Sequence, residues 1–379
     1  MQLKKKKIVF LTGTRADYGK IKSLMKRIIS DKEFELYLFV TGMHMLSRYG
    51  STWREIEKDG FKNVYHFINQ SKNNPMDLAL SNTIGGLSNY ISEIEPDLVV
   101  VHGDRLEALA GAIVGAFNNI RVAHIEGGEV SGTIDESIRH AVTKFAHLHL
   151  VSNEESKKRI IQLGEKPDHV FIIGSPDIDI MHSENLPSIE EAKKRYDIPF
   201  DCYGIVMYHP VTTEIDKLSK NIEAFTKALI QSNRNYIVIY PNNDLGSDTI
   251  IKQYELLAAN DKFVIYPSIR FEYFLTLMKH ADFMIGNSSA GIRESIIYGT
   301  PAIDVGNRQS GRYKKDENSL IIHVDECEEK LMQAINKVPQ QKIHVKSHFG
   351  NGDSAEKFMG IIKQPTIWNV DIQKKFSDI

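Results

Sequence analysis

Carboxylates, imidazoles and guanidinium groups gather behind two short apolar runs in the first half of the chain. Residues 98–101 lead into Asp104, residues 122–125 lead into Glu126, and a loop then brings in Asp135. In open α/β sheets, ligands bind outside the carboxyl ends of the parallel strands, so these carboxylates are offered to one edge. We therefore predict an enzyme that handles a polar, anionic substrate. The same stretch carries further polar residues: His102, Arg105, His124, Glu129, Arg139 and His140.

A glycine-bearing turn joins the first expected strand, 7–12, to the first expected helix, 18–30. The turn differs from a phosphate loop, because its two glycines are one residue too far apart and Ile21 stands where Ser or Thr would hold magnesium. The start of a helix can still bind an anion through free N–H groups. Arg15 and Lys20 would add positive charge there. A plain strand-to-helix turn is the equally weighted alternative.

A second turn, residues 287–294, follows the apolar strand 283–285 and opens another expected helix. Ser288 and Ser289 are suited both to capping that helix and to binding a phosphate. Glu294 could accept hydrogen bonds from a ribose diol, as acidic residues do in nucleotide-binding folds. A capped helix without a ligand would have the same sequence. His209 follows the strand 205–208, so the same rule places it at the edge of its sheet.

Two weaker signals would suit a metal, but each has a simpler interpretation. Asp177 and Asp179 resemble the Asp-x-Asp metal site of some glycosyltransferases, and a helix cap or turn is favoured there. His147 and His149 have no third ligand at a suitable spacing, so hydrogen-bonded neutral histidines are favoured. We predict no metal site and no redox cofactor, since a dinucleotide fingerprint is absent from the sequence.

Composition narrows the class of protein. A chain of 379 residues suggests two or three domains, and 42% hydrophobic residues suffice for sizeable cores. The net charge of −2 disfavours nucleic-acid or membrane-surface partners. Two cysteines favour a reducing cytoplasm over a disulfide framework. No uninterrupted apolar segment approaches the roughly 20 residues of a membrane-spanning helix.

Strands and helices alternate along the whole chain, which is typical of doubly wound parallel α/β sheets. Residues 175–199 hold three prolines and little apolar periodicity, so we place a domain boundary there. The expected domains are 1–175 and 176–362, each Rossmann-like. We expect the C-terminal segment 363–379 to pack back on the first domain.

Taken together, the motifs resemble the hydrolysing UDP-N-acetylglucosamine 2-epimerases over essentially the whole chain. They occur in the family's order and include Thr12-Gly-Thr-Arg-Ala-Asp17, Val101-His-Gly-Asp-Arg105, His124-Ile-Glu-Gly-Gly-Glu129, Ser131-Gly-Thr-Ile-Asp135, Ser137-Ile-Arg-His140, His209-Pro-Val-Thr-Thr213, Gly286-Asn-Ser-Ser289 and Gly306-Asn-Arg-Gln309. The resemblance implies a glycosyltransferase B type fold, two Rossmann-like domains with a central cleft. It implies conversion of UDP-N-acetylglucosamine and water to N-acetylmannosamine and UDP, the first step towards sialic acid.

The resemblance also implies roles for individual residues. Asp104, Glu126 and Asp135 match the catalytic carboxylates, and His209 is placed with them. We expect the substrate to contact Arg15, Lys20, Arg105, Arg139, Asn242, Ser288, Ser289, Glu294 and Arg308. We expect UDP-N-acetylglucosamine as the small-molecule partner and a homo-oligomer, either a dimer or a tetramer.

Three alternatives remain at this point. The nearest is the same reaction on UDP-N,N'-diacetylbacillosamine, which serves legionaminic acid synthesis. The second is a UDP-sugar glycosyltransferase of the same architecture, disfavoured by the carboxylate cluster of Asp104, Glu126 and Asp135. The third is a non-catalytic nucleotide-sugar sensor, disfavoured for the same reason.

Overall fold

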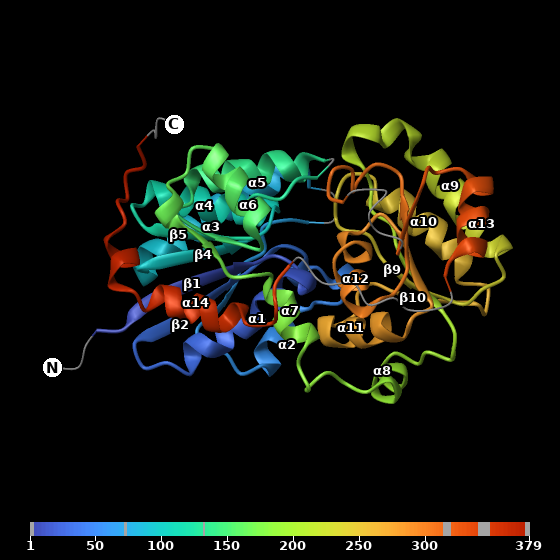
Figure 1. Cartoon of the computed structure of the whole chain (residues 1–379), viewed down its shortest axis with the longest axis horizontal. Coiled ribbons are helices and arrows are strands. Elements are labelled where there is room, and N and C mark those ends of the chain that lie inside the picture. Colours follow the sequence, from blue (N-terminus) through green and yellow to red (C-terminus); the bar gives the residue numbers. More distant parts are fainter. Residues whose placement is uncertain (1–3, 72–73, 132, 314–319, 340–348, 376–379) are drawn as a thin grey trace. The chain divides into compact units, whose positions relative to one another are not determined.

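The computed structural model describes residues 4–71, 74–131, 133–313, 320–339 and 349–375. The chain divides into two compact units. The first comprises Met1–Glu129, Asp135–Ser183 and His348–Ile379, and the second comprises Val130–Ile134 and Glu184–Ser347. Each contains one parallel sheet flanked by helices (Figure 1). The predicted α/β class with two parallel sheets is therefore confirmed.

The first unit is built on a seven-stranded sheet in the order β3-β2-β1-β4-β5-β6-β7. Its strands are β1 (Lys6–Thr12), β2 (Phe34–Val40), β3 (Val64–His66), β4 (Leu98–His102), β5 (Arg121–Ile125), β6 (Leu148–Val151) and β7 (Val170–Ile172). Its helices are α1 (Arg15–Ile29), α2 (Trp53–Lys58), α3 (Met76–Ile94), α4 (Leu106–Phe117), α5 (Ile134–Phe145), α6 (Glu154–Gln162), α7 (Pro176–Met181) and α14 (Ser354–Ile362).

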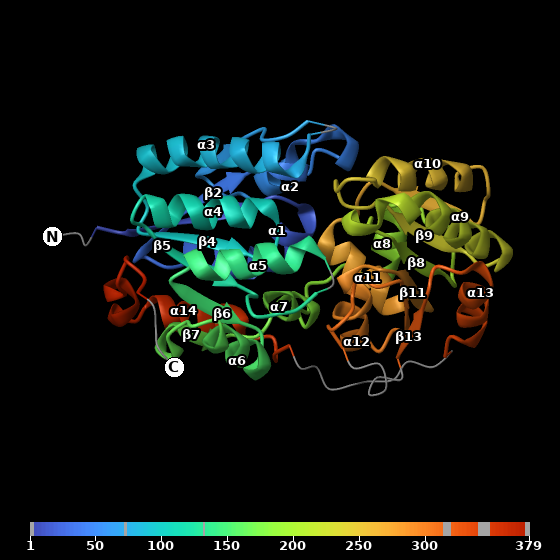
Figure 2. The same ribbon diagram turned by 90° about the horizontal axis from the view of Figure 1, so that it is seen from above.

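Strand β1 shows why this sheet needs helices on both faces. Successive side chains of a strand point to opposite faces. Ile8 and Phe10 belong to a core with α1 and α14, whereas Val9 and Leu11 belong to a core with α3, α4 and α5. Helices α3 and α4 lie side by side over that second face (Figure 2). Burying each such side chain contributes about 1.5–3 kcal/mol relative to leaving it exposed.

The second unit has a six-stranded sheet in the order β10-β9-β8-β11-β12-β13. Its strands are β8 (Gly204–Met207), β9 (Tyr236–Ile239), β10 (Phe263–Tyr266), β11 (Phe283–Gly286), β12 (Ala302–Val305) and β13 (Ile321–Val324). Its helices are α8 (Ile189–Arg195), α9 (Ile215–Gln231), α10 (Ser247–Leu257), α11 (Phe271–His280), α12 (Glu294–Tyr298) and α13 (Glu328–Lys337). Helices α9, α10 and α13 share one core with the sheet, and α11 packs against α8 and α12.

Both sheets reverse their winding direction at one point. In the first unit β1 lies between β2 and β4, and in the second unit β8 lies between β9 and β11. From β1 the chain first adds β2 and β3 on one side and then β4 to β7 on the other side. From β8 it likewise adds β9 and β10 on one side and β11 to β13 on the other. Such switch points open a crevice at the carboxyl ends of the strands, where ligands of doubly wound sheets bind.

The chain returns to the first unit at its C-terminal end. Asp179 accepts hydrogen bonds from the backbone N–H groups of Ser354 (2.9 Å) and Ala355 (2.8 Å), which caps the start of α14. Trp368 stacks on Phe34 with ring centroids 6.3 Å apart. Lys374 pairs with the buried Glu165 at 2.6 Å. Residues 376–379 of the expected C-terminal segment, and Gly132 of the fourth motif, lie outside the described residues.

The segment expected to be an irregular boundary, 175–199, contains two helices. Pro176 occupies the first turn of α7. Backbone N–H groups there have no partner within the helix, so the helix loses no hydrogen bond to proline. A capping box between Ser188 and Glu191 starts α8. Both helices are short, so their apolar periodicity is too brief to recognise in the sequence. Strand β1 and helix α1 lie close to their predicted ranges, 7–12 and 18–30.

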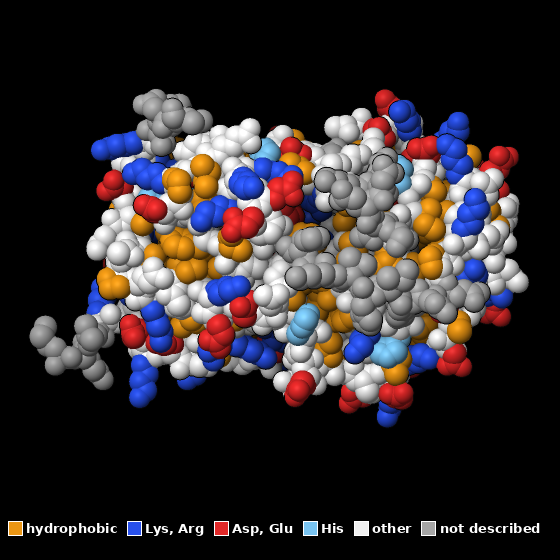
Figure 3. All heavy atoms as spheres, viewed as in Figure 1, with side chains coloured by type: hydrophobic (Ala, Val, Ile, Leu, Met, Phe, Trp, Pro, Cys, Tyr) orange, Lys and Arg blue, Asp and Glu red, His pale blue; other side chains and the backbone are white. Residues whose placement is uncertain are grey.

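Surface charge is mixed, as the net charge predicts. Acidic and basic side chains are interspersed over the described part of both units on the face that Figure 3 shows. No helix within the described ranges is both long and apolar enough to cross a membrane.

Candidate active site

Asp104 and Arg139 meet beyond the carboxyl end of β4. A guanidinium nitrogen of Arg139, in α5, donates to the carboxylate of Asp104, and another donates to the backbone oxygen of Glu129 at 2.9 Å. The Arg139 side chain is 1% exposed and that of Asp104 is 26% exposed. Burial alone would lower the pKa of Arg139, but Asp104 and Glu129 raise it. Arg139 thus stays charged and pairs with Asp104.

Asp135 lies in the first turn of α5, one helical turn before Arg139. Its negative charge contributes to the raised pKa of Arg139. A carboxylate near the start of a helix is stabilised by the positive end of the helix dipole. Asp104 thus contacts the Arg139 guanidinium group, and Asp135 acts on the same group through its charge.

Glu126 follows β5 directly and is buried. Its backbone has a φ of 63°, in the left-handed region that non-glycine residues rarely adopt. Such strain costs on the order of 1–3 kcal/mol and is concentrated at functional sites. The hydroxyl of Ser175 donates to one carboxylate oxygen of Glu126. The other lies 3.3 Å from Nε2 of His102.

His102 and His124 differ in charge at this edge of the first sheet. Nδ1 of His102 lies 2.8 Å from the carboxylate of Asp17. Burial alone would lower the pKa of His102, but Glu126 and Asp17 raise it to about 10. Burial lowers the pKa of His124 to about 3, and its Nε2 donates to the backbone oxygen of Gly103 at 2.8 Å. His102 is thus cationic at neutral pH and His124 is neutral.

Three other predicted substrate-binding cations of the first unit each contact a carboxylate. Arg15 pairs with Glu55 at 2.6 Å, and the Nε of Arg105 lies 3.4 Å from Glu107. Lys20 is buried and lies 3.2 Å from Asp177 of α7. Lys20 therefore ties α1 to α7, and its predicted contact with the substrate stays a prediction.

The two aspartates of the Asp-x-Asp sequence have separate structural contacts. Asp177 pairs with Lys20, and Asp179 caps α14 as described above. This agrees with the favoured interpretation as a cap. Among the described residues, no group of three His, Cys, Asp or Glu side chains is placed to hold a metal ion.

In the second unit, His209 and Asn287 join the ends of β8 and β11. The N–H of His209 donates to the side-chain oxygen of Asn287 at 2.6 Å, and the Asn287 amide donates back to the His209 carbonyl at 2.8 Å. The N–H of Asn242 donates to Nδ1 of His209 at 3.0 Å. Nδ1 is therefore an acceptor, and a neutral His209 carries its ring proton on Nε2.

The loop after β12 also contacts Asn287. Arg308 donates to the backbone oxygen of Asn287 at 3.3 Å, and the amide of Gln309 donates to it at 2.8 Å. The Ser288 hydroxyl accepts the N–H of Ala290, which caps a 3₁₀ turn, Ser289–Gly291. The expected helix begins later, as α12, and its first residue Glu294 is buried. The predicted residues His209, Asn242, Ser288, Glu294 and Arg308 all follow the carboxyl ends of strands of the second sheet.

Comparisons with known proteins show the family of this chain. Residues 26–363 match the sequence model of the UDP-N-acetylglucosamine 2-epimerase family. A UDP-N-acetylglucosamine 2-epimerase of Neisseria meningitidis is 50% identical over 99% of this chain and 99% of its own length. The chain belongs to this family.

More distant members of the epimerase family are also similar along most of their length. The hydrolysing UDP-N,N'-diacetylbacillosamine 2-epimerase of Legionella pneumophila is 32% identical and covers 94% of this chain and 96% of its own. A crystal structure of the Methanocaldococcus jannaschii UDP-GlcNAc 2-epimerase, in complex with UDP-GlcNAc and UDP, matches with a TM-score of 0.78 at 21% identity. It covers 94% of this chain and 99% of the other. The predicted fold type is thus confirmed.

Three residues that contact groups at these two sheet ends have no role predicted from the sequence. Asp17 holds His102, Ser175 donates to Glu126, and Gln309 donates to Asn287. Asp17 was visible in the first glycine-bearing turn, and Gln309 is adjacent to Arg308. Ser175 had no local signal, because it meets Glu126 only through the order of the strands.

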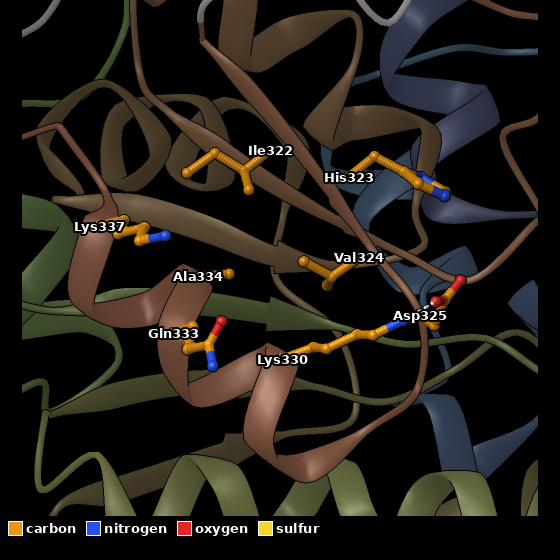
Figure 4. A pocket seen from close by; sticks show the side chains of 8 residues that line it. All are labelled: Ile322, His323, Val324, Asp325, Lys330, Gln333, Ala334 and Lys337. Carbon is orange, nitrogen blue, oxygen red and sulfur yellow. Dashed lines mark hydrogen bonds and ion pairs between the residues drawn. The ribbon is translucent and has the colours of Figure 1, made fainter.

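A separate pocket of about 230 Å³ lies between β13 and α13 in the second unit (Figure 4). Lys330 crosses its rim to pair with Asp325 at 2.5 Å. The lining contains none of the candidate residues: it consists of Ile322, His323, Val324, Asp325, Lys330, Gln333, Ala334 and Lys337. We assign it no part in the reaction.

Proposed function

We propose that this epimerase converts UDP-N-acetylglucosamine and water to N-acetylmannosamine and UDP. The carrying observation is the grouping of Asp104, Asp135 and Arg139, with Glu126 beside His102, at the carboxyl edge of the first sheet. Two carboxylates in different surroundings can serve as acid and base, because their environments separate their pKa values. The nearby carboxylates are what inversion at an unactivated carbon requires.

The C2 hydrogen of the sugar is not adjacent to a carbonyl, so simple deprotonation cannot invert that carbon. Elimination avoids the difficulty. A carboxylate takes the C2 proton, the electron pair forms a C1–C2 double bond, and the C1–O bond breaks to release UDP. We propose Glu126 as this base, because its buried carboxylate lies 3.3 Å from Nε2 of the cationic His102.

The product of this step is 2-acetamidoglucal, to which water adds. One group protonates C2 on the face opposite to the one that lost the proton, and a second group removes a proton from the water that attacks C1. We propose Asp104 and Asp135 for these transfers, because both carboxylates act on the charged Arg139. The released sugar has the manno configuration at C2.

The second unit supplies the nucleotide contacts in this proposal. Arg308 and the hydroxyls of Ser288 and Ser289 would bind the diphosphate, where negative charge develops on the leaving group. Glu294 would accept from the ribose. His209, which carries its ring proton on Nε2 when neutral, and Asn242 would complete the contacts.

Similarity to named relatives supports the substrate and the use of water. The relative at 50% identity is named for UDP-N-acetylglucosamine, whereas those named for diacetylbacillosamine reach 32% and 34%. Both of the latter are named as hydrolysing. A polysialic acid biosynthesis protein of Escherichia coli is 35% identical, which agrees with a product destined for sialic acid. The diacetamido sugar remains the second candidate.

Reaction in deuterium oxide tests this proposal. We expect UDP and free N-acetylmannosamine carrying deuterium at C2, because C2 is reprotonated by a group that exchanges with solvent. Proton NMR would show loss of the C2 hydrogen signal. UDP-N-acetylmannosamine as the final product would show that UDP, not water, adds back. Free N-acetylglucosamine without deuterium would exclude epimerisation, and turnover of only the diacetamido sugar would replace the substrate.

Binding of UDP alone tests the nucleotide site. We expect Arg308→Ala to weaken UDP about 10- to 100-fold, since a hydrogen bond to a charged group contributes about 1.5–3 kcal/mol. Isothermal titration calorimetry gives the affinity. Arg234→Ala is the matched control, because Arg234 lies over Phe283 at the amino end of the same sheet. Equal affinities for the wild type and Arg308→Ala would move the site elsewhere.

A further inference from the structure

Four side chains form a continuous polar chain through the buried edge of the first unit. Asp17 of α1 contacts Nδ1 of His102, Nε2 of His102 faces Glu126, and Ser175 donates to the far oxygen of Glu126. Asp17, Glu126 and Ser175 follow β1, β5 and β7, and His102 is the last residue of β4. The resemblance gives a role to Glu126 alone among them.

Asp17 is itself fixed in place. Its N–H donates to the Thr14 hydroxyl at 3.1 Å, and one of its carboxylate oxygens accepts the N–H of Gly13 at 3.2 Å. The other oxygen holds His102. Because Asp17 is anchored at the start of α1, the imidazole ring cannot turn without losing that contact. Its second nitrogen therefore stays directed at Glu126.

The contact between His102 and Glu126 is a charge contact. Their atoms lie 3.3 Å apart, but the geometry at Nε2 falls short of an aligned hydrogen bond. The side chains of His102, Asp17 and Glu126 are 8%, 13% and 5% exposed, so water screens their charges weakly. The titratable groups around the ring are Asp17 from α1, Glu126 after β5, and the neutral His124 of β5.

We propose that His102, clamped by Asp17, is the positioning residue that keeps Glu126 ionised and oriented to accept the C2 proton. The inference rests on the role proposed for Glu126. In the elimination step the proton passes from C2 to the Glu126 carboxylate, and His102 keeps both of its ring protons. Ser175 holds the other oxygen of Glu126 and so fixes the plane of the carboxylate. The strained backbone of Glu126 persists because these contacts hold its side chain.

The charge of His102 can be measured without any turnover. In the full-length protein labelled with ¹⁵N-histidine, we expect one ring to remain doubly protonated well above pH 8, since its pKa is raised to about 10 by Glu126 and Asp17 against burial. His102→Gln assigns the signal. Asp17→Asn and Glu126→Gln should each lower its titration midpoint. A neutral His102 at pH 7 would overturn the proposal.

Kinetics then separates positioning from a structural role. An opposite charge within about 4–6 Å favours the ionised form of a carboxyl group, and the His102 ring carries such a charge beside Glu126. We therefore expect His102→Gln to move the acidic limb of the kcat profile to higher pH. It should lower kcat at neutral pH at least about 10-fold with little change in KM, because the misplaced base affects the chemical step.

Asp17→Asn should have the same effects in smaller measure, which keeps the test decisive where His102→Gln folds poorly. His149→Gln is the matched control, since His149 is buried and lies 3.1 Å from a carboxylate, Glu165, outside the site. A lower kcat with an unmoved acidic limb in both site variants would overturn the proposal. A wild-type chain without epimerase activity would overturn the proposed function, and the NMR titration would still decide the charge of His102.

Discussion

Replacing Asp104, Glu126 or Asp135 by its matching amide should lower kcat at least about 100-fold in each variant, the usual scale of lost acid–base catalysis. The amides are nearly isosteric, but they cannot accept a proton at neutral pH. The chemical step should lose its base or acid while UDP still binds through the second unit. We therefore expect kcat and kcat/KM to fall together in a coupled assay of UDP release.

Asp97→Asn is the matched control for these variants. Asp97 precedes β4, at the opposite end of the strand from Asp104, and pairs with Lys6 at 3.2 Å. Its loss should leave turnover unchanged. The Asp104→Asn variant should also unfold at lower denaturant concentration, because Arg139 keeps a buried charge with a weaker partner. Near-normal kcat in all three amide variants would remove the proposed mechanism.

Gly286→Ala should destabilise the second unit by about 3 kcal/mol or more, because it combines overpacking with backbone strain. Gly286 ends β11 with a φ of 140°, and a Cβ there would lie 1.9 Å from the backbone oxygen of Met207. That oxygen belongs to the neighbouring strand, so relief requires the strands to separate. The separation would also break the paired hydrogen bonds of His209 and Asn287 that follow.

Equilibrium unfolding in urea measures the effect, and Gly291→Ala is its control. Gly291 lies five residues further on, and a Cβ added there would meet nothing closer than 3.6 Å. We expect the control to unfold near the wild-type midpoint and to bind UDP. Equal midpoints for Gly286→Ala and Gly291→Ala would show that β8 and β11 can separate at little cost, contrary to the close approach described above.

Much of the fold and part of the site could be predicted from local sequence. Strands such as β4, β8 and β9 are largely continuous apolar runs, which parallel strands buried on both faces require. The residues that end those runs, such as Asp104, Glu126 and His209, lie at the strand edges as expected. Short helices such as α7 and α8 were not predicted, because two turns give too little apolar periodicity to detect.

The sequence by itself thus determined the class of fold, the family and which residues stand at the strand edges. Only the tertiary structure decided which of them meet. His102 pairs with Asp17, 85 positions away, and Ser175 reaches Glu126 across 49 positions. Lys20 faces Asp177 for the same reason. These pairings follow from the order of the strands and the winding reversal beside β1. Apolar periodicity and helix caps act over a few residues, whereas strand order is set by packing of the whole sheet, so no local pattern encodes it.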